Sequence, residues 1–258
     1  MRFCKLVLYF LILFNFFLSK LALSAGKAIE YPDKNWSFSS IFGTFDKASA
    51  QRGFQVYKEV CAGCHGMRLI SYRNLAALGY NQDELKAIAA QFEITDGPND
   101  DGEFFTRPGR PSDKFASPYP NKKAAIAANG GAYPPDLSLI IKARPNGANY
   151  LHALLSGYVE PPKNIKVPEG MYYNKFYSGN LIAMPQPLYE DGIEYLDGTK
   201  ASPDQMAIDV TTFLAWASEP ELEERKQLGI TVILFLIVFS ILSYFSMRQI
   251  WAPIKNKN

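Results

Sequence analysis

Residues Cys61-Ala62-Gly63-Cys64-His65 form the stretch of this sequence that decides the fold. The pattern C-x-x-C-H is the attachment signature of a c-type haem. Two thiols three positions apart can both reach the vinyl groups of one porphyrin, and the histidine after them lies where its imidazole can ligate the iron. The sequence therefore predicts one covalently attached haem c, with thioethers at Cys61 and Cys64 and with His65 as an iron ligand.

A structural zinc site and a thioredoxin-like dithiol are the alternative readings of the same motif. A structural zinc ion needs four ligands, and outside the motif only Cys4 and His152 remain, which are not a closely spaced pair. A thioredoxin-like dithiol needs a strand before it, whereas residues 48–60 read as a helix. Both alternatives are less consistent with the sequence than haem attachment.

The N-terminus has the order of a secretory signal peptide. Arg2 and Lys5 precede an apolar run over 6–18, and small residues follow near Ala25. We therefore expect residues 1–24 to be a cleaved signal, which would remove Cys4. A retained N-terminal membrane helix is the alternative.

Near the other end, residues 228–247 are apolar and contain no charge. Twenty residues at about 1.5 Å each span a hydrocarbon core of about 30 Å, so we expect a transmembrane helix. Export of the N-terminus then places residues 25–227 outside as one c-type haem domain and residues 248–258 in the cytoplasm. The expected location is the bacterial inner membrane, single-pass, with the haem domain on the periplasmic side.

The formal charge of +2 for the whole chain hides an acidic exported part. Three basic residues fall in the expected signal and three in the expected tail. The exported part keeps 21 of the 27 basic residues against all 25 acidic ones, a net charge of −4. This balance favours a basic protein partner and gives no indication of nucleic-acid binding.

Helical signals dominate the exported part, so the predicted fold class is mainly α. Hydrophobic periodicity and capping residues predict helices at 47–60, 83–92, 122–128, 148–156 and 203–217. The clearest start is Ser202-Pro203-Asp204-Gln205, which fits a capping box with proline at the first helical position. Residues 93–120 and 158–200 read as long irregular loops, which commonly surround a cofactor or contact partners.

A haem that only transfers electrons needs a second axial ligand, and the sequence offers few. Met184 is favoured because Pro185 and Pro187 deny the segment a helix and stiffen it as an extended strap. Met67 is too close to His65, and Met206 lies on the apolar stripe of a helix. His152, Met171 and an open sixth position remain as alternatives.

Several segments together resemble the cytochrome c1 family, the haem subunit of the cytochrome bc1 complex. They occur in order over nearly the whole mature chain, and they are Arg52–Tyr57, Cys61–His65, Asn129–Ser138, Ala143–Pro145, Tyr172–Asn174, Ile182–Pro185 and the C-terminal anchor.

The resemblance implies a cytochrome c-like haem domain enlarged by long loops, with iron held by His65 and Met184. It also implies that Pro135 packs on the ring and that Arg144 pairs with a haem propionate, while Tyr150 and Leu154 line the pocket. A buried propionate needs a cation, and a guanidinium can bind a carboxylate with two hydrogen bonds.

The function implied by the resemblance is electron transfer from a Rieske iron–sulfur protein through haem c to a basic cytochrome c, in a dimeric complex with cytochrome b. Quinol oxidation would occur on another subunit. A membrane-anchored c-type cytochrome of another respiratory complex, or a haem enzyme with an open sixth position, is the alternative. Acidic residues over 83–103 and 190–197 favour a basic partner.

Overall fold

The computed structural model describes residues 29–255, and the side chains of residues 29–253. The expected signal over 1–24, with Cys4, lies outside the described residues, and so does the end of the expected tail, 256–258. The described part is mainly helical, as the sequence predicts, with two short antiparallel strand pairs between helices.

The described helices agree closely with the predicted ones. They are, in chain order, α2 (Lys47–Val56), the π-helical turn η1 (Tyr57–Cys61), the 3-10 helix η2 (Tyr72–Leu78), α3 (Gln82–Ala89), α4 (Lys122–Ala128), α5 (Gly147–Ser156), α6 (Pro203–Ser218) and α7 (Leu222–Lys255). The predicted cap of α6 is confirmed, because the Ser202 side chain accepts a hydrogen bond from the Gln205 amide at 3.3 Å. The Gln205 side chain does not complete a capping box and donates to Asp209 instead.

The two long segments that read as irregular contain short strands. Strand β1 (Glu93–Asp96) pairs with β2 (Phe105–Pro108), with Glu93 opposite Pro108. Strand β3 (Tyr172–Tyr173) pairs with β4 (Leu181–Ile182). Strands of two to four residues are too short for the alternation of polar and apolar residues to predict them.

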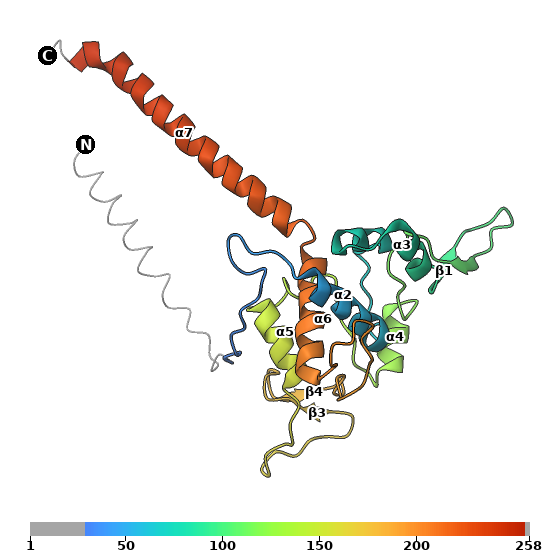
Figure 1. The fold of residues 1–258 in the computed structure, drawn as a ribbon. Helices are drawn as coiled ribbons and strands as arrows, with labels where there is room; N and C mark the ends of the chain where they lie inside the picture. Colours follow the sequence, from blue (N-terminus) through green and yellow to red (C-terminus); the bar gives the residue numbers. More distant parts are fainter. Residues whose placement is uncertain (1–28, 256–258) are drawn as a thin grey trace, which may run out of the picture. The chain divides into compact units, whose positions relative to one another are not determined.

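Helix α2 crosses α6, and α5 packs beside α6 (Figure 1). Gly53 permits the close crossing, because a Cβ atom there would lie 2.0 Å from the Asp209 carbonyl oxygen. Around this contact Phe54 and Phe213 have ring centroids 5.6 Å apart, and both side chains are buried. The crossing therefore fixes where the C-terminal end of α2, and the motif after it, lies.

A buried ion pair also joins the two crossing helices. Asp209 of α6 is fully buried and accepts hydrogen bonds from Arg52 Nε at 2.9 Å and Nη2 at 3.0 Å. Ser49 of α2 donates to the same carboxylate at 2.7 Å. The Asp209 carboxylate raises the pKa of Arg52, although burial of the guanidinium opposes it. Hydrogen bonds on both carboxylate oxygens are what a buried charge requires.

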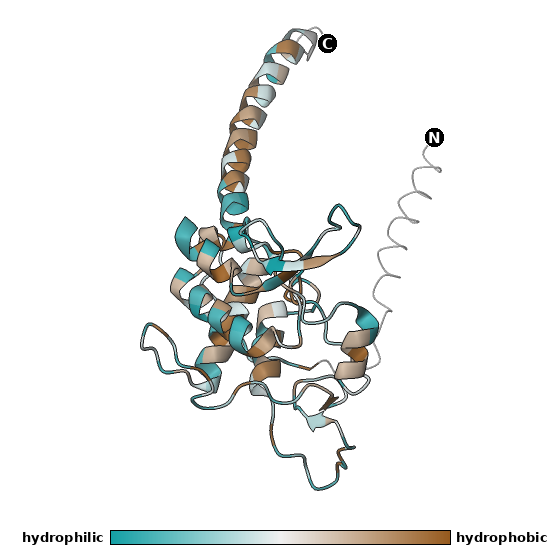
Figure 2. Cartoon of the chain, turned by 90° about the vertical axis from the view of Figure 1, so that its right-hand side faces the viewer, coloured by the Kyte–Doolittle hydropathy of each residue, from teal (hydrophilic) through white to brown (hydrophobic). Residues whose placement is uncertain are grey.

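Helix α7 is longer than the predicted span over 228–247, because its charged first turns are helical as well. Its apolar stretch is seen as the brown part of the long helix in Figure 2, above a teal first turn. Within the described residues it is the helix that is long and apolar enough to cross a membrane. The expected borders of the exported domain, the span and the tail remain predictions.

Candidate functional site

A cavity of about 710 Å³ lies at the C-terminal end of α2. Its walls come from η1, the loop over 129–140, helices α5 and α6, and the strap over 182–187. All eight residues that the sequence singles out line it: Cys61, Cys64, His65, Pro135, Arg144, Tyr150, Leu154 and Met184. The structure thus brings together residues from widely separated parts of the chain, although their individual roles remain predictions.

The two cysteines lie on the last turn of the helix and just beyond it. The Cys64 and His65 amides both donate to the Cys61 carbonyl, at 3.1 and 2.9 Å, so the motif forms a tight turn. Cys61 and Cys64 are free cysteines. Burial raises the pKa of the Cys61 thiol to about 12, and the neighbouring Cys64 adds to this. Each S–H group can add across a vinyl double bond to give a thioether.

The His65 imidazole is held in one orientation by the backbone. Its Nδ1 lies 2.7 Å from the Pro135 carbonyl oxygen. A carbonyl only accepts hydrogen bonds, so Nδ1 carries the hydrogen and Nε2 keeps a lone pair for a metal. Burial lowers the pKa of His65, although the Pro135 carbonyl opposes this. The sequence does not reveal this contact, because every residue has a backbone carbonyl.

The loop that carries Pro135 is fastened to the residues after the motif. The Asp136 carboxylate accepts from the Arg68 amide at 3.0 Å and from the Ser138 amide at 2.9 Å. The Leu137 amide donates to the Gly66 carbonyl at 2.9 Å. Two of these hydrogen bonds join the loop to Gly66 and Arg68 and the third lies within the loop, and through Pro135 they fix the imidazole.

Met184 follows β4, and its backbone is held from α5. The Tyr158 hydroxyl, just after α5, donates to the Met184 carbonyl at 3.0 Å. Burial raises the pKa of Tyr158 beyond its ordinary value, so the hydroxyl remains a donor. Leu188 at the end of the strap is buried. The strap is therefore anchored on both sides of Met184.

Asn174 supports the same strap from the neighbouring strand. It is fully buried, and its Nδ2 donates to the Leu154 carbonyl of α5 at 2.8 Å. Its Oδ1 accepts from the Phe176 backbone amide at 3.0 Å, and the backbone N–H of Asn174 donates to the Asn180 carbonyl at 2.8 Å. These bonds fasten β3 and the turn before β4 to the end of α5.

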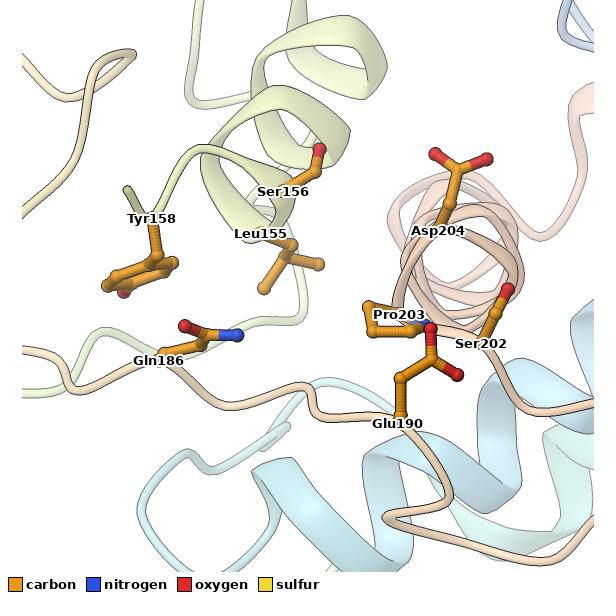
Figure 3. Close-up of a pocket in the computed structure, with 8 residues that line it drawn as sticks. All are labelled: Leu155, Ser156, Tyr158, Gln186, Glu190, Ser202, Pro203 and Asp204. Atoms are coloured by element: carbon orange, nitrogen blue, oxygen red, sulfur yellow. The ribbon is translucent and has the colours of Figure 1, made fainter. Parts of the chain in front are cut away.

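A smaller cavity of about 310 Å³ borders the strap (Figure 3). Gln186 and Tyr158 line it, whereas Pro185 and Pro187 line the larger cavity, so successive strap residues face the two spaces. The Glu190 carboxylate and the α6 N-terminus close the other side of this smaller cavity. Met184 faces the larger space.

The alternative axial ligands are engaged elsewhere. His152 is buried, its Nε2 lies 2.9 Å from Asp204 Oδ1, and it does not line the larger cavity. Met67 and Met206 are core residues, the second as predicted. Met171 is also absent from the walls of this cavity. Among the methionines that the structure describes, Met184 is the one that faces the cavity.

Arg144 is the guanidinium that lines the cavity. It is an exposed residue whose Nη1 donates to the Ala143 carbonyl at 3.1 Å. Burial raises the pKa of the neighbouring Tyr150, and the Arg144 side chain partly opposes this. The remaining donors of the guanidinium can therefore receive an anionic group at the cavity edge.

The donor set fits a c-type haem better than zinc. Two thiols, an imidazole nitrogen and a thioether sulfur line one cavity with mostly apolar walls. In the part of the chain that the structure describes, no group of three or more His, Cys, Asp or Glu side chains is arranged to hold a metal ion.

The acidic residues of the β1–β2 hairpin differ in how they are paired with basic residues. Asp96 forms an ion pair with Arg107, which also pairs with Asp113 at 2.7 Å. Arg107 holds the pKa of both carboxyls below the ordinary value. Asp100 and Asp101 lie exposed in the loop between β1 and β2. The charges of Asp100 and Asp101 at the loop are therefore less offset than that of Asp96.

Comparison with known proteins identifies relatives that match most of the chain. The chain is 50% identical to "Cytochrome c1 1, heme protein, mitochondrial" of Arabidopsis thaliana over 90% of its own length and 76% of that protein. It is 48% identical to cytochrome c1 of Rhodospirillum rubrum over 86% of its length and 88% of that protein. It is also 48% identical to the "Cytochrome b-c1 complex catalytic subunit, mitochondrial" of Candida albicans, over 91% of its length and 82% of that protein.

The family model described as "Cytochrome C1 family" matches residues 36–254, which include the complete cavity and nearly all of α7. With this match and relatives close to 50% identity, the chain belongs to the cytochrome c1 family.

Proposed function

We propose that this chain is the electron-transfer haem subunit of a cytochrome b-c1 complex and that it carries one haem c bound through Cys61 and Cys64. The observation that carries the proposal is the meeting of both thiols, the His65 imidazole and Met184 at one cavity. Relatives named as heme proteins and as a b-c1 complex subunit support it.

His65 and Met184 are the proposed iron ligands. When bound, the haem supplies a one-electron redox centre. The Pro135 carbonyl keeps the hydrogen on Nδ1 of His65 and leaves Nε2 to the iron. Tyr158 and the flanking prolines hold the Met184 backbone, so the Met184 sulfur can stay in place in both oxidation states of the iron.

The remaining cavity residues exclude water and receive the charged edge of the haem. Leu137, Leu154 and Leu214 are buried apolar wall residues. Arg144 is proposed to pair with a propionate, Tyr150 to line the same edge and Pro135 to pack on the ring. Apolar surroundings strengthen electrostatic interactions, so the axial ligands and the burial of the haem would set its reduction potential.

The proposed partners are cytochrome b and the Rieske iron–sulfur protein within a dimeric complex, with a basic cytochrome c as electron acceptor. Helix α7 supports anchoring by a single membrane span. The signal-like order of residues 1–24 supports a haem domain on the periplasmic side of a bacterial inner membrane.

Docking of the acceptor cytochrome c at the acidic loop between β1 and β2 can be tested by the salt dependence of cytochrome c reduction. Replacing Asp100 and Asp101 by Asn should slow cytochrome c reduction at low salt and reduce the dependence of the rate on ionic strength. Asp96→Asn is the matched control, because Arg107 already offsets that charge, and it should have the smaller effect. Unchanged rates and salt dependence in the double variant would exclude docking at this loop.

Haem attachment is tested on the purified, denatured chain. Haem absorbance should stay with the polypeptide in the native sequence and be lost when Cys61 and Cys64 are both replaced by Ala. Absence of covalently retained haem from the native chain would disprove the proposal.

Axial ligation by Met184 is tested by carbon monoxide binding to the ferrous protein. The native protein should resist binding at neutral pH, whereas Met184→Leu should bind readily and keep its covalent haem. Met171→Leu is the matched control and should behave as the native protein does. Ready binding by the native protein would instead favour an enzyme with an open sixth position.

Membership in the complex is tested by solubilising the membrane in mild detergent and identifying the proteins that purify with the chain. Cytochrome b and a Rieske protein should be present in equal amounts with it. Their replacement by subunits of an oxidase or a dehydrogenase would favour the other respiratory role.

A further inference from the structure

A turn before α2 presents two large hydrophobic side chains to the outside. The Gly43 amide donates to the Ser40 carbonyl at 3.0 Å, which places Ile41 and Phe42 at the two central positions of a β-turn. Ile41 is 73% exposed and Phe42 is 79% exposed. Central turn positions usually carry Gly, Asn, Asp or Pro, and adjacent exposed hydrophobic residues indicate a contact surface.

The turn projects from an ordered base. The rings of Trp36 and Phe38 stack with centroids 5.7 Å apart, and Phe38 lies 5.1 Å from Phe45. Phe45 is buried in the core. The aromatic side chains on both sides of the turn thus face inward or pack on one another, while Ile41 and Phe42 do not.

Helix α7 holds this turn by the side chain of Lys226. The Lys226 Nζ donates to the carbonyls of Phe38, Ser40 and Gly43, at 2.7, 2.7 and 3.0 Å. An ammonium group has three donors, so these contacts use all of them. One side chain of α7 therefore accounts for hydrogen bonds to three backbone carbonyls, two in the turn and one, that of Phe38, just before it.

A second residue of α7 holds the end of the same segment. The Glu223 Oε1 accepts a hydrogen bond from the Phe45 amide at 2.8 Å. Glu223 and Lys226 are three positions apart and so lie on one face of the helix. Two contacts on one helix face fix the turn against the start of α7.

These contacts place the turn at the level where the membrane begins. Lys226 is two positions before Leu228, where the apolar stretch starts, a distance of about 3 Å along the helix axis. A backbone close to lipid needs its polar groups satisfied by protein. Lys226 satisfies three such carbonyls at the base of the turn, those of Phe38, Ser40 and Gly43.

We propose that Ile41 and Phe42 insert into the headgroup and acyl boundary of the bilayer that α7 crosses, as a second and shallow anchor. Apolar side chains at such an interface bury to a depth of about 5–10 Å. With α7 as one attachment and the turn as the other, the haem domain is restrained from rotating about the helix axis. The lipid interface is the favoured occupant because the turn is continuous with the membrane-spanning helix.

The test uses a single spin label at Phe42→Cys, in the complete complex in phosphatidylcholine nanodiscs. In the proposed holoprotein the thiols of Cys61 and Cys64 are taken up as thioethers, and Cys4 lies in the expected cleaved signal, so the introduced thiol is the labelling site of this chain, which is labelled before it is combined with the other subunits. The label should be severalfold more accessible to oxygen, which partitions into lipid, than to a water-soluble nickel chelate. Leu196→Cys is the matched control, because Leu196 is 97% exposed in a loop remote in sequence, and its label should favour the nickel chelate.

Two results would overturn the proposal. A label at position 42 with the same nickel accessibility as at position 196 would place the turn in water. A label shielded from both reagents would indicate contact with another subunit instead of lipid.

The role of Lys226 is tested by adding Lys226→Met to the labelled variant. Loss of the three hydrogen bonds should increase the mobility of the label and reduce its ratio of oxygen to nickel accessibility. An unchanged mobility and ratio would exclude Lys226 as the residue that holds the turn, and resistance of the ferrous protein to carbon monoxide, as in the native protein, would show that the variant is folded.

Discussion

The two sides of the haem cavity are held by different kinds of structure. The side with His65 follows α2 directly, and α2 is fixed by its crossing with α6 and by the Arg52–Asp209 ion pair. The side with Met184 lies in a long loop, where Tyr158 and Asn174 supply hydrogen bonds. The first side is part of the helical core, whereas the second can loosen locally. Of the two proposed iron ligands, we therefore expect Met184 to be lost more easily than His65.

The largest expected effect comes from removing the buried ion pair that holds α2, the helix leading to His65. Asp209→Ala would leave the buried part of Arg52 without its main partner and remove the acceptor of Ser49. Removing one partner of a buried ion pair costs about 3–5 kcal/mol. Chemical denaturation of the detergent-solubilised holoprotein should show a loss of this size, with both sides of the cavity lost in one transition.

Asp197→Ala is the matched control, because Asp197 pairs with the same guanidinium at 2.9 Å but its side chain is 45% exposed. Exposed pairs contribute about 0–1 kcal/mol, so this variant should stay close to the native stability. Equal losses in the two variants would show that the buried crossing is not what holds α2.

The next effect should be confined to the Met184 side. Asn174→Ala removes the donor to the Leu154 carbonyl, which keeps only the hydrogen bond from the Gly157 amide at 3.3 Å, and the acceptor of the partly buried Phe176 amide. An unsatisfied buried group costs about 1–3 kcal/mol, and because one group keeps a partner and the other is only partly buried, a loss of about 1–3 kcal/mol in total is expected. Carbon monoxide should then bind the ferrous protein while the covalent haem and the His65 side remain intact.

Asn164→Ala provides the control, since Asn164 is an exposed residue of the same loop region. It should leave stability and carbon monoxide binding unchanged. If Asn174→Ala lost stability without any gain in carbon monoxide binding, the loop would not be what keeps Met184 in position.

The same contrast explains how much the sequence could predict. The motif, the helix that leads into it, the cap of α6 and the membrane helix depend on residues close together in the chain, and local patterns predict them. The place of Met184 on the cavity wall also agrees with sequence reasoning, because its flanking prolines are a local signal, while its role as an iron ligand stays a prediction. The helical borders differ by a few residues, as in α3, which ends at Ala89 and not at residue 92.

The supports of the site were not predictable in the same way. The Pro135 carbonyl is a backbone acceptor, and Tyr158 and Asn174 are ordinary polar residues until the loop places them against α5. Arg107, the partner of Asp96, lies just outside the acidic stretch, so counting charges over 83–103 overstated the free charge there. Contacts between segments distant in sequence depend on the fold, and single-sequence patterns do not contain them.

A smaller effect is expected from the single hydroxyl that holds the strap. Tyr158→Phe removes the hydrogen bond to the Met184 carbonyl but keeps the ring. Loss of one such bond costs about 0.5–1.5 kcal/mol. The midpoint potential should fall slightly and carbon monoxide binding should rise slightly, because a looser thioether favours ferrous iron less. Tyr189→Phe, at a 57% exposed residue, should change neither quantity.

The smallest effect concerns α5, the helix to which the Met184 side is fastened. Its His152 is buried against Trp36 and lies beside Asp204 and Lys34, which themselves form an ion pair at 3.4 Å. Burial, helped by Lys34, lowers the pKa of His152 below its ordinary value of 6.5, and Asp204 offsets only part of this. The folded protein therefore binds a proton at His152 less readily than the unfolded chain does.

It follows that the free energy of unfolding should decrease as the pH falls from 6.5 towards the lower pKa of folded His152. Above pH 6.5 the contribution of His152 to stability should be fully retained. His65 is the other histidine of the chain and is the proposed iron ligand, so His152 should account for the histidine part of this slope. Denaturation between pH 5 and 8 should show a shallower slope for His152→Gln than for the native protein. The same slope in both proteins would mean that the junction between α5 and α6 does not sense pH, and that the Met184 side is no weaker in acid than the His65 side.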